Sequence, residues 1–385
     1  MKRVFCVLLC LTALFLAACG GESEFSAVSG ESVSDVSELS SASEESVSEQ
    51  STLEQSDASD PADDSSEEAP PTPPETETTL EFLASYPFGD DSLVKRSTGM
   101  QPDANGVYPL DLQGKILADE NGVLYLIPYF AMGEIVNLTE NKVAATFPEP
   151  TSPWQEYVLY PTFHDGKLYL VQSDSLVVSF DLATGERTEY PYFRDTFRGE
   201  SWFLVPELCE YDGKLLVAPG NREYYTPDGE KVSGVKALSV SVQTKNTLVM
   251  FGGKTLKFPT RNQPAEFTLL AGDRLMERWI ERVPGETNLF RHWYRLCDTD
   301  GNPISCFFAE LLVNRETPVP CDPIPFADFT VDRFYPQVIT VGGQTFRDVA
   351  LPFEVVGKDG TVYEALLYPD RLDLYRISAG YQDVP

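Results

Sequence analysis

A turn followed by a strand recurs along this chain, and the recurrence limits the fold more than any other feature. The clearest copy spans residues 163–190, where Asp165-Gly166 supplies the turn and Lys167–Gln172 is rich in residues that suit a pleated surface. Residues 176–182 then carry apolar groups at both odd and even positions, which indicates a strand covered on both faces. The polar run 187–190 is typical of an outer edge strand. The stretch therefore predicts a small sheet with a polar edge.

The same signature returns at Asn121-Gly122, Asp212-Gly213 and Asp359-Gly360. The glycine intervals are 44, 47 and 147 residues, and the last divides into three steps of 49, so two degenerate units are expected between 213 and 360. A period of about 40–50 residues marks propellers or solenoids, and the scarcity of helical patterning removes the helical solenoids. We predict an all-β fold, a β-propeller with six blades, with seven blades as the alternative.

These units resemble the bacterial propeller repeats of the NHL, YVTN and quinoprotein-like kind, whose blades carry Asp-Gly-x-Leu-Tyr-Val and Asp-x-x-Thr-Gly-Glu. The two motifs appear best at 165–170 and 181–186, and the resemblance covers roughly residues 100–385. The resemblance implies a fold and little about function, because these motifs are structural turns that proteins of many activities share. His164 precedes one turn where the other units have Glu120, Tyr211 or Lys358. It is expected to be a variable loop position.

The first 18 residues have the three-part layout of an export signal: Lys2 and Arg3, an apolar core, and small residues at the end. The stretch Leu16-Ala17-Ala18-Cys19-Gly20 resembles the lipobox of bacterial lipoproteins. That resemblance implies a diacylglyceryl thioether on Cys19 and a lipid-anchored protein on the extracytoplasmic side of a bacterial cell membrane. An ordinary cleaved signal with an incidental cysteine is the alternative.

Residues 19–80 form an acidic, Ser-, Glu- and Pro-rich linker. Residues 20–80 contain 17 acidic residues and no Lys or Arg, and such a segment cannot bury enough apolar surface to offset its ordering entropy. We expect a disordered tether between the anchor and a propeller domain at 81–385; a cation-binding or modified acidic tail is the alternative. The net charge of the whole chain is −31. Subtracting the net charge of −17 on residues 20–80 and of +2 on the signal leaves a net charge of −16 on residues 81–385. A negatively charged domain is a poor partner for nucleic acid.

Several local patterns have both a structural and a functional interpretation. Residues 80–86, or alternatively 106–112, are expected to pair with the last blade and close the ring. Gly252-Gly253 predicts a hairpin over 246–258. Gly253-Lys254-Thr255 matches only the end of a phosphate-binding P-loop, because Leu248 occupies the position where that motif needs glycine. Residues 274–283, 289–297 and 304–312 predict two long hairpins. Asp298, Asp300 and Asn302, which lie between the last two of these segments, are more typical of a turn than of a calcium-binding loop.

The chain has two histidines and no metalloprotease, hydrolase-elbow or dinucleotide motif. His292 lies in a predicted strand beside Trp293 and Tyr294 and is expected to be packed there. The sequence names no catalytic residue, no metal ligand and no cofactor. A glycosidase-like pair of carboxylates remains open, because that chemistry needs two acids that are close in space and not in sequence.

The remaining cysteines of the domain are Cys209, Cys297, Cys306 and Cys321, which allow two disulfides in three pairings. Cys297 and Cys306 flank one turn and could face each other across a hairpin. Trp154, Trp202, Trp279 and Trp293 could serve either blade packing or an exposed surface that binds sugars or a partner.

The sequence favours a cell-surface lipoprotein whose propeller binds or scaffolds an envelope protein or a glycan. The alternative is a propeller-type hydrolase or lyase, for example a glycosidase, with carboxylates at the central channel. A sensor or assembly factor for other envelope proteins is a third hypothesis. In each case the specificity is expected in the segments that differ between blades, above all residues 259–335.

Overall fold

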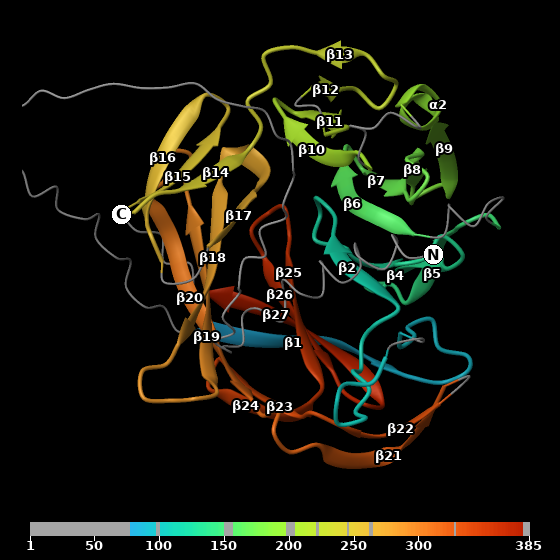
Figure 1. Cartoon of the computed structure of the whole chain (residues 1–385), viewed down its shortest axis with the longest axis vertical. Coiled ribbons are helices and arrows are strands. Elements are labelled where there is room, and N and C mark those ends of the chain that lie inside the picture. The colour runs from blue at the N-terminus through green and yellow to red at the C-terminus, as the bar shows by residue number, and fades with distance from the viewer. Residues whose placement is uncertain are drawn as a thin grey trace, which may run out of the picture. The chain divides into compact units, whose positions relative to one another are not determined.

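The computed structural model describes residues 78–97, 101–149, 157–197, 205–220, 223–244, 246–261, 265–326 and 329–379. All of them belong to the compact unit Glu68–Pro385. The predicted signal, Cys19 and most of the predicted linker lie outside the described residues, as do Trp154 and Trp202. The described chain is a six-bladed β-propeller, which confirms the predicted fold class and the preferred blade number (Figure 1).

The blades follow one another along the chain, and within each sheet the strands are mostly neighbours in sequence. Blade 1 contains β2 (Gly114–Ala118), β3 (Leu124–Pro128), β4 (Glu134–Asn137) and β5 (Lys142–Thr146); blade 2 contains β6 (Val158–His164), β7 (Lys167–Gln172), β8 (Val177–Asp181) and β9 (Glu186–Tyr190), and a short helix α2 (Tyr192–Phe197) follows it. Blade 3 contains β10 (Glu207–Tyr211), β11 (Lys214–Ala218), β12 (Tyr224–Tyr225) and β13 (Lys231–Val232); blade 4 contains β14 (Ser239–Val242), β15 (Asn246–Phe251) and β16 (Lys254–Pro259). Blade 5 begins with β17 (Glu266–Leu269), the 3-10 turn η2 (Ala271–Asp273), β18 (Leu275–Arg282), β19 (Leu289–Cys297) and β20 (Pro303–Val313). Blade 6 contains β25 (Leu351–Val356), β26 (Val362–Leu367) and β27 (Arg371–Ala379), joined by β1 (Thr78–Pro87).

The second blade has the burial pattern that its sequence predicts. All of β8 except Asp181 is buried, while β9 at the sheet edge has no buried residue. Asp165 and Gly166 both adopt positive φ, 49° and 72°, at the β6–β7 turn. Apolar side chains of successive blades pack together; for example, Leu168 and Leu170 of blade 2 share a cluster with Ile135 of blade 1. The seams between blades therefore make the core.

The ring is closed by β1, which pairs antiparallel with β27 from Thr78 to Pro87. This confirms the role predicted for residues 80–86. The Ser85 hydroxyl donates to Asp373 at 2.6 Å, and the Tyr86 hydroxyl donates to the carbonyl of Leu138 in blade 1. The alternative segment 106–112 contributes only one isolated bridge, between Leu112 and Arg96.

The degenerate region forms blades 4 and 5. The hairpin at Gly252-Gly253 is confirmed, with φ values of 53° and 83°. The two long hairpins predicted at 274–312 share β19 and lie in one blade. The turn between β19 and β20 is organised by Asp298, whose carboxylate accepts the backbone N–H groups of Asp300 and Asn302, both at 2.8 Å. After β20 the chain inserts the two-stranded sheet β21 (Val319–Pro325) and β22 (Thr330–Phe334), and β23 (Gln337–Val341) and β24 (Gln344–Val349) then extend blade 5 to six strands.

The expectation that Cys297 and Cys306 face each other is wrong. A register shift in the β19–β20 pairing places Cys297 opposite Pro303 and Cys306 opposite Arg295. All four described cysteines carry reduced thiols. Cys297 instead packs with Leu275 and Phe251 in the apolar cluster between blades 4 and 5.

Candidate functional site

The turns that precede the second strands of blades 2, 3 and 6 meet at one end of the propeller. His164 Nδ1 lies 3.0 Å from Glu210 Oε1, and Lys358 forms an ion pair with the same Glu210 oxygen. His164, Glu210 and Lys358 belong to blades 2, 3 and 6, and blades 3 and 6 are opposite in a ring of six. The Glu210–Lys358 pair therefore spans the axis. His164, predicted to be a variable loop position, is the last residue of β6 and contacts Glu210 of the neighbouring blade.

A second charged cluster lies between blades 5 and 6. Glu354 of β25 contacts His292 Nδ1 through one carboxylate oxygen and lies 3.6 Å from Arg278 Nη1 through the other. Arg278 also pairs with Glu266 of β17. Lys115 of blade 1 retains contact with solvent, but the surrounding protein atoms, followed by the positive charge of Arg278, lower its pKa. The first strands of three blades thus bring opposite charges together beside the channel.

Behind this cluster, Glu364 of β26 is nearly inaccessible and stands directly opposite Glu354. Its Oε2 atom has no hydrogen-bond partner among the described residues. Burial, followed by the charge of Glu354, raises the pKa of Glu364 well above its ordinary value. Two acids with different surroundings are what general acid and base chemistry requires. Glu354, however, is already held by two basic side chains.

The opposite face of blade 5 carries an aromatic ladder, which we define as Trp279, Trp293 and Phe308. These residues occupy neighbouring positions across β18, β19 and β20. The two indoles are stacked, with centroids 5.5 Å apart and planes 4° from parallel, and the Phe308 ring lies 4.7 Å from Trp293. All three side chains are half-exposed. Their strands contain 8, 9 and 11 residues, whereas those of blade 4 contain at most 6.

Arginines cover both ends of the aromatic ladder. Arg261 lies 4.0 Å above the Trp279 ring and Arg291 lies 4.9 Å from the Phe308 ring. Arg261 also contacts the fully buried Glu277 at 3.3 Å, and Arg291 contacts Glu310 at 2.9 Å. Trp279 is therefore contacted by Arg261 and by the stacked Trp293, and the Phe308 ring, tilted by 51° to Trp293, is contacted by Arg291.

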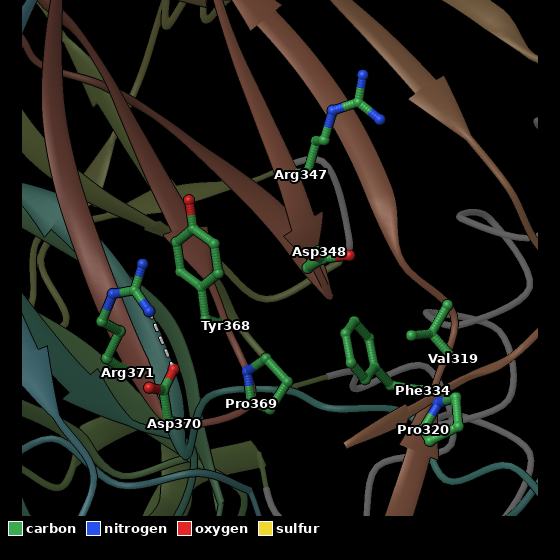
Figure 2. A pocket seen from close by; sticks show the side chains of 9 residues that line it. All are labelled: Val319, Pro320, Phe334, Arg347, Asp348, Tyr368, Pro369, Asp370 and Arg371. Carbon is green, nitrogen blue, oxygen red and sulfur yellow. Dashed lines mark hydrogen bonds and ion pairs between the residues drawn. The ribbon is translucent and has the colours of Figure 1, made fainter. Parts of the chain in front are cut away.

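The described residues also line an open pocket of about 410 Å³, which shares no residue with either charged cluster. Figure 2 shows its lining residues, which come from the inserted hairpin, the end of β24 and the β26–β27 turn. A hydrolase at the central channel would need a pocket beside its carboxylates. The pocket of Figure 2 belongs to another part of the fold.

Sequence reasoning correctly placed His292 in a strand beside Trp293 and Tyr294, but it did not find the contact with Glu354. It singled out Trp279 and Trp293 without pairing them. A signal for the pairing was present, because both residues lie seven positions from Glu286, between the predicted strands 274–283 and 289–297. Among the described residues, no group of three or more His, Cys, Asp or Glu side chains is arranged to hold a metal ion. None of the described helices has the length and apolar content needed to cross a membrane.

No family model matches the chain, and no curated protein matches it. Among solved structures, the N-terminal domain of Nup159 aligns with 80% of this chain and 98% of its own, at 10% identity and a TM-score of 0.31. BamB from Moraxella catarrhalis aligns with 79% of this chain and 99% of its own, at 9% identity and a TM-score of 0.29. The computationally designed protein Ika8 aligns with 77% and 99%, at 9% identity and a TM-score of 0.31. Likeness at this level gives no ground for transferring a ligand or an activity.

Proposed function

We propose that this protein is a lipid-anchored, extracytoplasmic binding module that holds another envelope protein against the aromatic ladder of its fifth blade. The observation that carries the proposal is the aromatic ladder on strands longer than those of the neighbouring blade. Tryptophan, phenylalanine and arginine are enriched at the centres of protein interfaces and among their energetic hot spots. Here two indoles, a phenyl ring and two arginines occur together on one half-exposed sheet face.

A protein partner fits this surface better than a glycan does. A sugar stacks on a free ring face, but Trp279 already has Arg261 over its ring and Trp293 stacked on it. The half-exposed rings and the adjacent Glu281 and Glu310 carboxylates suit mixed apolar and polar contacts with a protein.

The tether and the anchor complete the proposal. Cys19 would carry the lipid, and two or three acyl chains hold a protein to a bilayer where one chain exchanges. The acidic segment 20–80 would give the propeller reach, on the order of 40–50 Å for about 60 residues of flexible chain. Cys19→Ser, expressed in a bacterium that lipidates exported proteins, is expected to move the protein from the membrane fraction to the soluble extracytoplasmic fraction. Retention in the membrane would contradict the anchor.

Photo-crosslinking tests the proposed surface. Benzoylphenylalanine would be placed at position 293 or 308 of the full chain in cells of the producing bacterium, with position 82 as the control. Phe82 is an exposed aromatic, 55% accessible, on a different blade. We expect the same discrete protein adduct from 293 and 308 and none from 82. An adduct of equal yield from 82, or no adduct from the ladder, would reject the surface, and a protease-resistant carbohydrate adduct would indicate a glycan instead.

The opposed carboxylates Glu354 and Glu364 support a second candidate, a hydrolase that acts on a glycosidic bond. If so, the purified domain should release nitrophenol from at least one member of a panel of nitrophenyl glycosides, and Glu364→Gln should lower that rate at least a hundredfold. Equal rates for the wild type and Glu364→Gln would assign the pair a structural role.

A further inference from the structure

Blade 4 has three strands among the described residues, whereas each of the other blades has at least four. Lys254 begins β16, and its Nζ atom donates to the carbonyl of Thr299 at 3.1 Å. Thr299 lies in the turn between the third and fourth strands of blade 5. Near the other end of β16, Phe258 lies 5.0 Å from Phe267 of β17, the strand that begins at the opposite end of blade 5. β15 and β16 therefore run as the third and fourth strands of blade 4.

β14 then takes the place of a second strand, and the first, innermost strand of blade 4 is missing. In the other blades the second strand pairs on both sides, whereas β14 pairs with β15 alone among the strands that the structure describes. The second strands β3 and β26 are buried along their whole length, while β14 has no buried residue. Val240 and Val242 of β14 are 43% and 61% exposed. Blade 4 therefore presents an unpaired edge where the other blades have an inner strand.

The backbone of this edge is free to accept another strand. At the β14–β15 turn the Gln243 N–H donates to the carbonyl of Asn246. By the alternation of an antiparallel ladder, the backbone groups of Ser241 also point toward β15, and those of Val240 and Val242 point away from it. No hydrogen bond from another described part of the backbone engages Val240 or Val242. A row of unpaired N–H and C=O groups is a template for an added strand.

The charge of blade 4 limits what can pair there. Residues 231–265 contain six basic residues and no Asp or Glu, although the domain as a whole is acidic. The six are Lys231, Lys236, Lys245, Lys254, Lys257 and Arg261. Lys236, Lys254 and Lys257 are exposed and form no ion pair within 4 Å with any residue that the structure describes. An acidic strand therefore fits this blade better than a basic or a neutral one.

The same chain contains an acidic segment long enough to reach this edge. Residues 22–60 include 11 of the 17 acidic residues of the linker, no Lys or Arg, and no proline, so each of their backbone N–H groups can donate. Residues 61–77 contain five prolines and lead into β1 at Thr78. This connector can span up to about 55 Å when extended, whereas a domain of about 300 residues has a radius of gyration of about 19 Å. The covalent link also gives the segment an effective concentration in the millimolar range.

We propose that a stretch within residues 22–60 adds to β14 as the first strand of blade 4, held by backbone hydrogen bonds to Val240 and Val242 and by the lysines of the blade. Main-chain hydrogen bonds supply the affinity in this mode of binding, so the segment needs few apolar side chains. The inference goes beyond the function proposed above, because neither the lipid anchor nor the aromatic ladder takes part in the pairing. Pairing shortens the free part of the linker, so the paired and released forms differ in how far the tether reaches.

Hydrogen–deuterium exchange of two purified chains, residues 20–385 and residues 78–385, tests the pairing. We expect the amides of Val240 and Val242 to exchange at least tenfold more slowly in the longer chain, independently of protein concentration. The control is β9, the exposed edge strand of blade 2, whose exchange should agree within twofold between the two chains. Equal exchange of β14 in the two chains would overturn the proposal. Protection that grows with protein concentration would also overturn it, because the added strand would then come from a second copy.

Substitutions in the longer chain test the charges and the edge separately. Replacing the 11 acids of residues 22–60 with Gln or Asn should abolish the protection of β14, whereas the same change at the six acids of residues 61–77 should leave it within twofold. Val240→Pro removes one donor of the free edge and no hydrogen bond with β15, so it should abolish the protection of Val242. The same substitution in the chain 78–385 should change Tm by less than about 2 °C, because the edge is unpaired there. Equal effects of the two acid replacements, or protection that survives Val240→Pro, would contradict the added strand.

Discussion

Glu354 and Glu364 stand directly opposite one another on β25 and β26, and their carboxyl groups have different partners. Glu354 contacts His292 and Arg278. Burial opposes the ionisation of Glu354, but its hydrogen bond with His292 and the electrostatic effect of these two basic side chains outweigh burial and hold its pKa below the ordinary value. Glu364 is buried without a basic partner, so its pKa is raised well above the ordinary value. One acid of the pair is therefore charged and the other protonated over a wide range of pH.

Glu364→Gln should stabilise the domain increasingly as pH rises. A folded-state pKa above the unfolded value, about 4.3 for Glu, means that the folded protein binds the proton more tightly. That contribution to stability is complete below about pH 4.3 and is lost as pH rises toward the folded pKa. Glutamine does not titrate, so we expect its advantage over the wild type to grow from pH 5 to pH 7.5. Urea unfolding at the two pH values measures it.

Glu354→Gln is the matched control, and its effect should have the opposite sign. Removing this charge leaves His292 and Arg278 without their shared counter-ion, so we expect a loss of about 1–3 kcal/mol at pH 7.5. If both substitutions changed stability by the same amount and sign, the assignment of charge to Glu354 and of the proton to Glu364 would be wrong.

The sequence predicts what depends on neighbouring residues and misses what depends on blade packing. Asp165-Gly166 and Gly252-Gly253 specify their turns locally, because positive φ is needed at those positions. His292 and Glu354 are 62 positions apart. The alternation along a strand shows which residues share a face, but not which residue of the next blade meets that face. The open pocket depends on an insertion between β20 and β23 that interrupts the repeat, so periodicity could not place it.

Removal of β1 tests the closure of the ring. A chain beginning at residue 78 retains β1 and should unfold within about 2 °C of the longer domain beginning at residue 68. A chain beginning at residue 89 loses the partner of β27, together with the Ser85–Asp373 and Tyr86–Leu138 hydrogen bonds, and exposes an unpaired sheet edge. We expect this second truncation to lower Tm by more than about 10 °C or to abolish soluble expression. Equal Tm values in differential scanning fluorimetry would show that β1 does not close the ring.

Glu210 is expected to matter more than an ordinary surface acid, because it connects three blades. Glu210→Gln removes the charge that His164 and Lys358 share, at a position where its side chain is 31% exposed. We expect a loss of about 1–2 kcal/mol, allowing for partial screening by solvent. Glu140, which pairs with Lys142 on the surface at 54% exposure, provides the control, and Glu140→Gln should change stability by less than about 0.5 kcal/mol. Denaturant unfolding of both variants makes the comparison, and equal effects would mean that the pair across the axis contributes no more than a surface ion pair.

The four thiols of the domain should be countable and unreactive in the folded state. Burial raises the pKa of Cys297 to about 12 and that of Cys209 to about 11, so less than about one molecule in a hundred carries a thiolate at either position at pH 8. The purified domain, treated at pH 8 with dithionitrobenzoate and without any reductant, should therefore react slowly, and it should release four equivalents of thionitrobenzoate once guanidinium unfolds it. Two equivalents or fewer after unfolding would indicate a disulfide and contradict the reduced state of Cys209, Cys297, Cys306 and Cys321. A rapid burst of one equivalent from the folded domain, lost in Cys209→Ser, would instead show that the Cys209 thiol is more accessible than its burial between strands implies.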